Sequence, residues 1–487
     1  MFKLLHIVRR IGAYEFIAFV TGFVLMAFEL AASRVLAPTI GTSTYVWTSV
    51  IGVMIAALAA GYAAGGWMAD RRSEKLDIIW ILLMAAIAIL VTCVFYSDIL
   101  ASITLVIHDP RLQGVIASII LFVPASFLLG ITSPYLAKLR VHSTATTGRS
   151  VAGLSASNSV GGITGTFCTG FIFFTIIGSR ETLALLAIIL IICSWIIEPL
   201  LQRQQRTIAT VALLLALMLQ FVTPASAGSA INIDTPSAHY TIADITLHNK
   251  PVRVLAMGPG GWQSGVYLDN TGGLVFGYTR KLADAVAAAP SKNRILILGG
   301  GAFSLPEYLG RQYPDSTVDV VEIDSQLPAI AQKYFRYDQP SNVNVYTEDA
   351  RAYLQKTTNK YDFIIADVYS DASVPFALTT REYTAELKKV LKPDGVVAVN
   401  MIASTSQACL PLFASLNSSY ATSFKNSLYY PLVDPSLQTE QNVIAVYSNR
   451  PLSWAGQLPG NVPVQFTSAR KLTDNHAPIE YLKQLCK

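Results

Sequence analysis

Three glycines and two acids, spaced about 20 residues apart, are arranged as in a nucleoside-binding βαβ unit. The glycines Gly299, Gly300 and Gly301 directly follow one apolar run, and the acids Glu322 and Asp324 end a second one. Glycine lets the backbone approach a ligand where a Cβ would clash. An acid at the tip of the second strand can accept both ribose hydroxyl protons. A tight strand-to-helix turn without a ligand would explain the glycines but not the acids.

The spacing favours a nucleoside without a pyrophosphate. Dinucleotide sites need a third glycine where the helix faces the pyrophosphate, and that position holds Ser304. An S-adenosyl compound therefore fits better than NAD. Two further strands are expected to end in acids, at Asp349 and Asp367. In open parallel sheets the carboxyl ends of the strands form the edge where ligands bind, so we expect these acids to meet there.

In this order the motifs resemble the spermidine synthase family, the polyamine aminopropyltransferases. The resemblance covers roughly residues 235 to 450, and the matching residues are Gln263, Gly299-Gly300-Gly301, Glu322-Ile323-Asp324, Asp349-Ala350 and Asp367. The resemblance implies a Rossmann-like, class I methyltransferase-type domain preceded by a small β-subdomain. It also implies that Asp367 is catalytic and that the other matching residues bind the co-substrate.

The chemistry expected of these residues is alkyl transfer from a sulfonium nucleoside, either decarboxylated S-adenosylmethionine or S-adenosylmethionine. Glu322 and Asp349 would hold the ribose and the adenine. Tyr369 would face the sulfonium by cation–π attraction. Asp367 would orient an amine and take its proton. We expect a co-substrate rather than a permanently bound cofactor, and no Cys/His spacing indicates a metal site.

The departures from the family pattern concern mainly the acceptor. Ala302 stands where the family usually has Asp, and the segment from Asp367 to Asp371 is one residue longer than usual and lacks its proline. The acids that hold a diamine's ammonium groups are not recognisable near Tyr278-Thr279-Arg280. The sequence therefore supports the nucleoside half of the site more than the polyamine half.

Three functions remain open from the sequence. The first is an aminopropyltransferase-like enzyme that acts on a small-molecule amine and releases methylthioadenosine. The second is a methyltransferase or lyase that uses S-adenosylmethionine on the same fold. The third is a transporter or membrane sensor with a nucleoside-binding domain. The same acids serve the enzymatic functions, so the product distinguishes them.

The N-terminal part has the composition of a membrane protein. Hydrophobic residues make up 52% of the chain and charged residues 14%, with a mean hydropathy of +0.44, which is too apolar for an ordinary soluble enzyme. We expect a multi-pass domain of about seven helices over residues 1–227, a small β-subdomain over 228–285 and the Rossmann-like domain over 286–487. Seven stretches are long enough to span a bilayer: 14–36, 44–68, 77–97, 114–137, 152–177, 181–199 and 207–223. Residues 99–107 are expected to form a separate interfacial piece.

Charge is concentrated in alternate loops of this part. Residues 1–227 hold 14 Lys and Arg against 9 Asp and Glu, whereas the remainder holds 22 of each, so the basic balance does not indicate nucleic-acid binding. By the positive-inside rule the N-terminus is cytoplasmic, and seven spans place the soluble domain outside, on the periplasmic side of a bacterial inner membrane. The basic residues that set this pattern are Lys3, Arg9, Arg10, Arg71, Arg72, Lys75, Lys138, Arg140, Arg149, Arg203 and Arg206.

Smaller features of the sequence carry further expectations. Gly61-x-x-x-Gly65 and Gly161-x-x-x-Gly165 predict close packing between helices. Glu29 and Arg34 share the first span and are expected to be structural. Pro224-Ala-Ser-Ala227 resembles a signal cleavage site, although a linker after the last span is favoured. Cys409 and Cys486 could pair if the soluble domain is extracytoplasmic. Leu472–Pro478 predicts a turn and resembles a C-terminal signature of membrane-fused spermidine synthase-like proteins. Homo-oligomerisation is left open.

Overall fold

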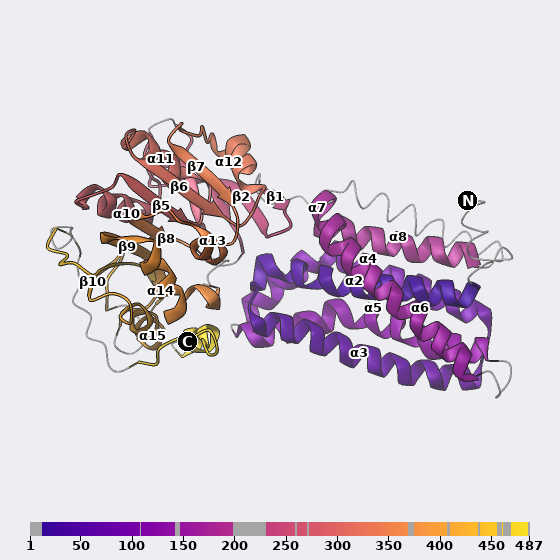
Figure 1. The fold of residues 1–487 in the computed structure, drawn as a ribbon. Helices are drawn as coiled ribbons and strands as arrows, with labels where there is room; N and C mark the ends of the chain where they lie inside the picture. The colour runs from indigo at the N-terminus through magenta and orange to yellow at the C-terminus, as the bar shows by residue number, and fades with distance from the viewer. Residues whose placement is uncertain are drawn as a thin grey trace. The chain divides into compact units, whose positions relative to one another are not determined.

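The chain forms two compact units in the computed structural model. Helices make up the first unit, residues 1–228 with 233–239, and the second unit, residues 229–232 with 240–487, is built around strands (Figure 1). The structure describes residues 12–107, 109–141, 147–197, 230–258, 261–269, 272–368, 375–406, 410–436, 439–454, 460 and 469–485.

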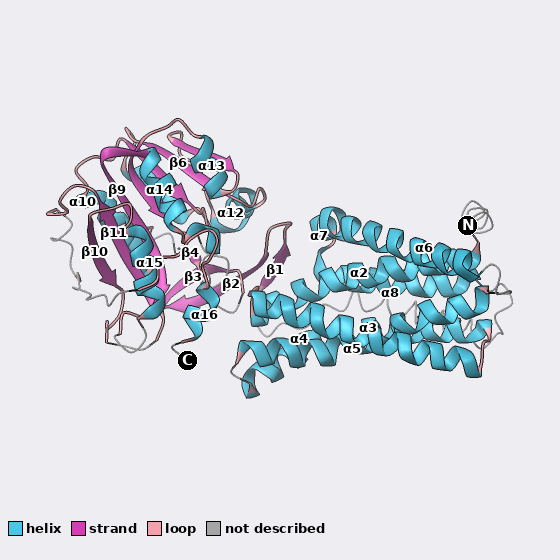
Figure 2. Cartoon of the chain, turned by 60° about the horizontal axis from the view of Figure 1, so that its bottom comes forward, coloured by secondary structure: helices cyan, strands magenta, loops and turns pink. Residues whose placement is uncertain are grey.

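The first unit is a bundle of long helices that run lengthwise beside one another (Figure 2). Six of the seven expected spans coincide with described helices, and the seventh, 207–223, lies outside the described residues. Four of the helices, α2 to α5, are long and apolar enough to cross a membrane. The elements are α2 (Ala13–Ile40), α3 (Thr44–Arg71), α4 (Lys75–Val106), α5 (Pro110–Arg140), α6 (Thr147–Cys168), the π-helical turn η2 (Thr169–Phe173), α7 (Phe174–Ile176) and α8 (Gly178–Ile197).

The expectation of a separate interfacial piece at residues 99–107 is wrong. α4 continues without a break to Val106 and is 32 residues long. No glycine or proline occurs between Lys75 and Val106, so nothing in the sequence interrupts the helical hydrogen bonds at Ser97 and Asp98. Ser102 also donates to the carbonyl of Asp98 within the helix, at 2.8 Å.

Both glycine pairs lie at close contacts between helices, as the sequence predicts. On α6, a Cβ at Gly161 would lie 2.0 Å from the carbonyl oxygen of Phe19 on α2. On α3, a Cβ at Gly61 would lie 2.3 Å from the carbonyl oxygen of Phe127 on α5. Gly165 repeats this contact one turn further along α6. The backbones approach closely only because these positions lack side chains.

The short segment 234–239 packs against the end of the helical bundle. Arg34 of α2 donates to the carbonyl oxygen of Thr235 at 3.1 Å and also to that of Pro236. Asp234 accepts from the backbone N–H of Ser179, at the start of α8, at 2.7 Å, and contacts the ring of His239. Arg34 therefore has the structural role expected of it. The C-terminal part of α2 and the N-terminal end of α8 together hold residues 234–239.

The second unit begins with a four-stranded sheet in the order β1-β2-β3-β4. Its strands are β1 (Ile231–Asp234), β2 (His239–Leu247), β3 (Lys250–Ala256) and β4 (Ser264–Tyr267). β2, β3 and β4 pair antiparallel. Val252 and Val254 of β3 are fully buried against Val275, which gives this small sheet its own apolar face.

The main sheet has seven strands in the order β10-β11-β9-β8-β5-β6-β7. β7, β6, β5, β8 and β9 are parallel, and β11 and β10 add an antiparallel edge. The four strands expected from the sequence are β5 to β8. The bounds are β5 (Arg294–Leu298), β6 (Thr317–Glu322), β7 (Val343–Thr347), β8 (Tyr361–Ala366), β9 (Leu391–Ala403), β10 (Asn426–Pro431) and β11 (Gln441–Ser448).

Helices cover both faces of this sheet, as in a doubly wound fold. Leu296, Leu298, Ile364 and Ala366 pack in one core with α13 to α15, and the intervening residues of β5 and β8 are buried on the other side. This architecture confirms the expected fold class. The helices are α10 (Gly277–Ala288), α11 (Ser304–Gln312), α12 (Leu327–Phe335), α13 (Ala350–Lys356), α14 (Arg381–Val390), α15 (Pro411–Tyr420) and α16 (Ile479–Gln484), with the 3₁₀ turn η3 (Phe376–Leu378).

The substitution Gly161→Ala tests the contact between α2 and α6. The added Cβ would overlap the carbonyl of Phe19, so we expect the free energy of unfolding to fall by about 2 kcal/mol. Gly153→Ala on the same helix is the matched control, because a Cβ there meets nothing within 4 Å. Thermal unfolding of the detergent-solubilised chain measures both, and equal stability of the two variants would contradict the close contact.

Candidate active site

The glycine turn after β5 is shaped by its neighbours. Gly299 has φ 95° and Gly301 has φ 53°, values that residues with a side chain rarely adopt. A Cβ at Gly299 would lie 2.1 Å from the backbone oxygen of Asp367. The backbone N–H of Asp367 in turn donates to the carbonyl of Leu298 at 3.0 Å. The first glycine therefore lets the ends of β5 and β8 meet.

Glu322, at the end of β6, points its carboxylate at the same turn. One oxygen accepts the backbone N–H of Gly300 at 2.8 Å, and the other accepts that of Asp324 at 3.0 Å. Burial raises the pKa of this carboxyl, although both backbone hydrogen bonds act in the opposite direction. A carboxylate oxygen accepts more than one hydrogen bond, so Glu322 keeps acceptor capacity for hydroxyl groups of a ligand.

The other acids of the predicted nucleoside site have different surroundings. Asp324 is buried and accepts from the hydroxyl of Tyr240 on β2 and from the backbone of Gln326, both at 2.9 Å. It therefore joins the small sheet to the main sheet. Asp349 is exposed and caps α13, where it accepts the backbone N–H of Ala352 at 2.9 Å. Ala350 is buried directly after it.

Asp367, the predicted catalytic acid, follows β8 and is held by a neighbouring side chain. Asn400 of β9 donates to one of its oxygens at 2.9 Å. Burial raises the pKa of Asp367 to about 6, although the hydrogen bond from Asn400 lowers it. A carboxylate with this pKa ionises just below neutral pH, so it can accept a proton from a nucleophile.

The small sheet contributes a wall over the glycine turn. Ser264 of β4 accepts the backbone N–H of Ala302 at 3.1 Å and lies 3.4 Å from the hydroxyl of Ser304. The predicted ligand residue Gln263 precedes it, and the backbone carbonyl of Gln263 accepts from the hydroxyl of Tyr278. The place of the third glycine is thus filled by a serine pair, which fits a ligand without a pyrophosphate.

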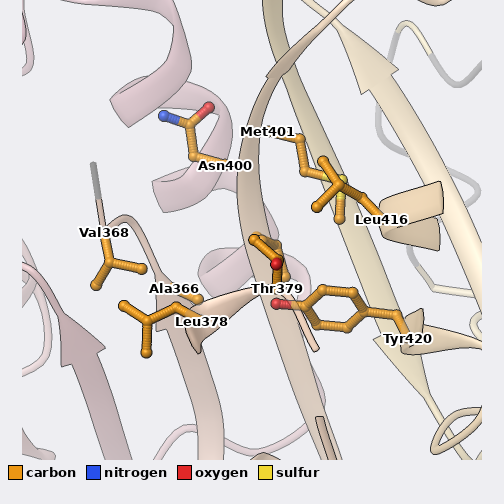
Figure 3. A pocket seen from close by; sticks show the side chains of 9 residues that line it. Ala366, Val368, Leu378, Thr379, Asn400, Met401, Leu416 and Tyr420 are labelled. Carbon is orange, nitrogen blue, oxygen red and sulfur yellow. The ribbon is translucent and has the colours of Figure 1, made fainter. Parts of the chain in front are cut away.

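A pocket opens beside Asp367 at the ends of β8 and β9 (Figure 3). Its cavity volume is about 20 Å³, which is room for about one water molecule. Figure 3 shows Met401, Leu416 and Tyr420 on one side and Ala366, Val368 and Leu378 on the other. Thr379, Val399 and Asn400 complete the lining. Among these described residues the lining is largely apolar and carries no charged side chain.

The predicted residues therefore fall into three groups. The turn after β5 brings together five of them: Gly299, Gly300, Gly301, Glu322 and Asp367. Asp349 and Ala350 lie instead after β7. Asp324 is occupied by contacts within the protein. Tyr369 lies outside the described residues. The described residues contain no cluster of His, Cys, Asp or Glu that could hold a metal ion.

Sequence reasoning missed Asn400, Tyr278 and Ser264. Asn400 could have been found by the rule that identified the acids, because it is a polar residue that follows the apolar run Val396–Val399 in a parallel strand. Tyr278 and Ser264 gave no such signal. Their contacts depend on how the small sheet and α10 pack against the main sheet.

We expect Glu322→Gln to weaken binding of methylthioadenosine on the order of 100-fold. The amide keeps the size of the side chain but places an N–H group where acceptors are needed, and charged hydrogen bonds are lost. Glu307→Gln is the matched control, since Glu307 pairs with Arg311 on the surface of α11. Calorimetry measures affinity and thermal unfolding checks the fold. A folded Glu322→Gln protein with unchanged affinity would remove Glu322 from the site.

Residues 275–453 match the family model of the spermine/spermidine synthase domain. A polyamine aminopropyltransferase of Vibrio vulnificus is 36% identical over 135 residues, which cover 27% of this chain and 45% of that protein. An N-terminal histidine N-methyltransferase of Emericella nidulans is 35% identical over 123 residues, covering 24% of this chain and 21% of that protein.

A probable polyamine aminopropyl transferase of Bifidobacterium longum is 36% identical over 129 residues, covering 26% of this chain and 28% of that protein. Among solved structures, a probable spermidine synthase of Corynebacterium glutamicum has a TM-score of 0.40 and 22% identity, covering 51% of this chain and 91% of that chain. The match thus spans less than half the length of these three curated relatives. Residues 275–453 are thus similar to the spermine/spermidine synthase domain and to part of these aminopropyltransferases.

Proposed function

We propose that the protein is a membrane-bound aminopropyltransferase that uses decarboxylated S-adenosylmethionine and a small-molecule amine. The observation that carries this proposal is Asp367, a carboxylate with a raised pKa that touches the glycine turn through its backbone. The relatives named as polyamine aminopropyltransferases support the same reaction. Neither a resident cofactor nor a metal is part of the proposal.

In the proposed reaction the amine nitrogen attacks the carbon next to the sulfonium. A nitrogen–carbon bond forms while the carbon–sulfur bond breaks, and the electron pair of that bond neutralises the sulfur. Methylthioadenosine leaves, and the ionised Asp367 takes the proton that the attacking amine loses. Asn400 donates to Asp367 and so favours its ionised form. Glu322 holds the ribose and Asp349 the adenine.

The acceptor is expected to differ from a simple diamine. Tyr278 and Thr279 are buried, and the Arg280 guanidinium donates to the carbonyls of Leu274 and Val275. This segment therefore offers a cation and no carboxylate to a second ammonium group.

Methyl transfer from S-adenosylmethionine is the second candidate. The relatives include N-methyltransferases, and Ala302 replaces an acid of the aminopropyltransferase pattern. In that case the product would be S-adenosylhomocysteine. A lyase would release methylthioadenosine without an acceptor, and a non-enzymatic transporter or sensor would release neither product.

The spectrum of products from the purified chain tests the proposal. With decarboxylated S-adenosylmethionine and a panel of amines, we expect methylthioadenosine and an aminopropylated amine in equal amounts. Turnover should fall as pH drops through about 6, because protonated Asp367 cannot accept a proton. Chromatography with mass detection measures both products across the pH range.

Asp367→Asn is the control for this experiment. The amide keeps the shape of the side chain but cannot act as a base, so turnover should fall by roughly 10²–10⁴ while methylthioadenosine still binds. S-adenosylhomocysteine formed from S-adenosylmethionine would support the methyltransferase instead. Near-normal turnover of Asp367→Asn would exclude Asp367 as the base.

We also propose that the second unit lies outside the cytoplasm, on the periplasmic side of a bacterial inner membrane. Residues 234–239 are held by Arg34 and Ser179, at the end of the bundle opposite to the N-terminus of α2. The basic turn Arg71–Lys75 lies at the other end, between α3 and α4. Under the positive-inside rule that basic end is cytoplasmic. This contact supports the charge pattern without depending on residues 198–229.

A reporter that is active only outside the cytoplasm tests this orientation. Fused after Lys487 of the full chain, it should be active, whereas the same reporter fused after Arg72 should be silent. The two sites are predicted to lie on opposite sides of the membrane. Activity at Arg72 and silence at Lys487 would place the second unit in the cytoplasm.

A further inference from the structure

Arg351 forms ion pairs with two carboxylates and a hydrogen bond to a backbone carbonyl. It lies on the first turn of α13, two residues after Asp349. Its guanidinium contacts Glu386 of α14 at 3.0 Å and the carbonyl oxygen of Ala377 in η3 at 3.1 Å. It also makes a two-pronged contact with Asp474, at 2.8 and 2.7 Å. One side chain thus joins four segments that are far apart in the sequence.

Asp474 belongs to the C-terminal turn that the sequence singled out. Thr473 and His476 pair across this turn, as expected for a plain turn. Asp474 adds specific contacts, since it accepts from the hydroxyl of Thr380 at 2.7 Å. Its backbone N–H donates to Glu382 at 3.1 Å. The pKa of Asp474 is lowered, first by its bond to Arg351. The turn is therefore fixed to the start of α14.

The elements joined by Arg351 carry both halves of the proposed site. Asp349 caps α13 and is the predicted adenine contact. Leu378 and Thr379, directly after the bonded carbonyl of Ala377, line the pocket beside Asp367. A substitution at Arg351 would therefore displace both the predicted adenine contact and the wall of the pocket. Arg351 itself does not line that pocket.

The geometry requires arginine rather than any cation. A guanidinium has five donors in a planar fork, so it can serve two carboxylates and a carbonyl together. A lysine ammonium is a point charge and matches such an arrangement less well. The side chains of Arg351 and Glu386 are 16% and 20% exposed, so this contact is shielded from solvent more than an ordinary surface ion pair, whereas the Asp474 side chain is 42% exposed.

We propose that Arg351 is a positioning residue for this site, and that Asp474 of the C-terminal turn fixes the orientation of the Arg351 guanidinium. The pair holds the start of α13 and residues 377–380 in one arrangement. The nucleoside and the acceptor are thereby bound in the relative positions that the transfer requires. The inference rests on the proposed function for its acceptor half. Its nucleoside half depends only on ligand binding.

Arg351→Lys and Asp474→Asn in the full detergent-solubilised chain test the inference. We expect each to weaken methylthioadenosine binding by about 10-fold, the middle of the range for coupled contacts, and to raise KM for the amine. Arg311→Lys is the matched control, because Arg311 also bonds two carboxylates, Glu307 and Asp338, on the surface of α11. Affinity is measured by calorimetry well below the unfolding temperature of each variant.

A purely structural role would give a different result. It would lower Tm while leaving the affinity of the folded protein within twofold of the wild type, as expected for Arg311→Lys. That outcome in both Arg351→Lys and Asp474→Asn would overturn the inference. Weakened methylthioadenosine binding without turnover of any amine would retain the nucleoside half of the inference and reject the proposed reaction.

Discussion

The close approach of Gly299 to the backbone of Asp367 is the constraint on which the site depends. No side chain fits at Gly299, because its Cβ would lie 2.1 Å from the carbonyl oxygen of Asp367. The contact brings the end of β8 against the turn after β5, where Glu322 already binds the N–H of Gly300. A carboxylate able to take a proton is thereby placed next to the loop that would hold a sulfonium nucleoside. Gly299 is thus required by the fold itself, apart from the role in ligand binding that the sequence predicts.

The strands and their terminal acids could be predicted because they depend on short-range patterns. β5 to β8 are strands of five or six residues rich in apolar side chains, and parallel strands place their carboxyl ends at one edge. The role of Asp324 could not be predicted in the same way. Its carboxylate accepts a hydrogen bond from Tyr240, which lies 84 residues earlier in the chain. No local sequence pattern predicts such a contact. The same holds for Tyr278 beside Asp367.

The helical unit shows the same division between local and long-range information. The glycine pairs predicted close helix contacts, and the contacts exist because α6 crosses α2 and α3 crosses α5 at those positions. The sequence did not indicate which helices would be partners. The length of α4 also differs from the expected span 77–97, because polar residues such as Ser97 and Asp98 do not end a helix in the absence of glycine or proline.

The turn between β1 and β2 belongs to the helical unit, whereas most of the sheet that follows belongs to the other unit. Arg34 and Ser179 hold this turn through hydrogen bonds rather than through the covalent chain. A cut in the chain after Ala227 would therefore leave residues 234–239 hydrogen-bonded to α2 and α8. For this segment, loss of the covalent link to α8 and loss of its place on the helices are separate events.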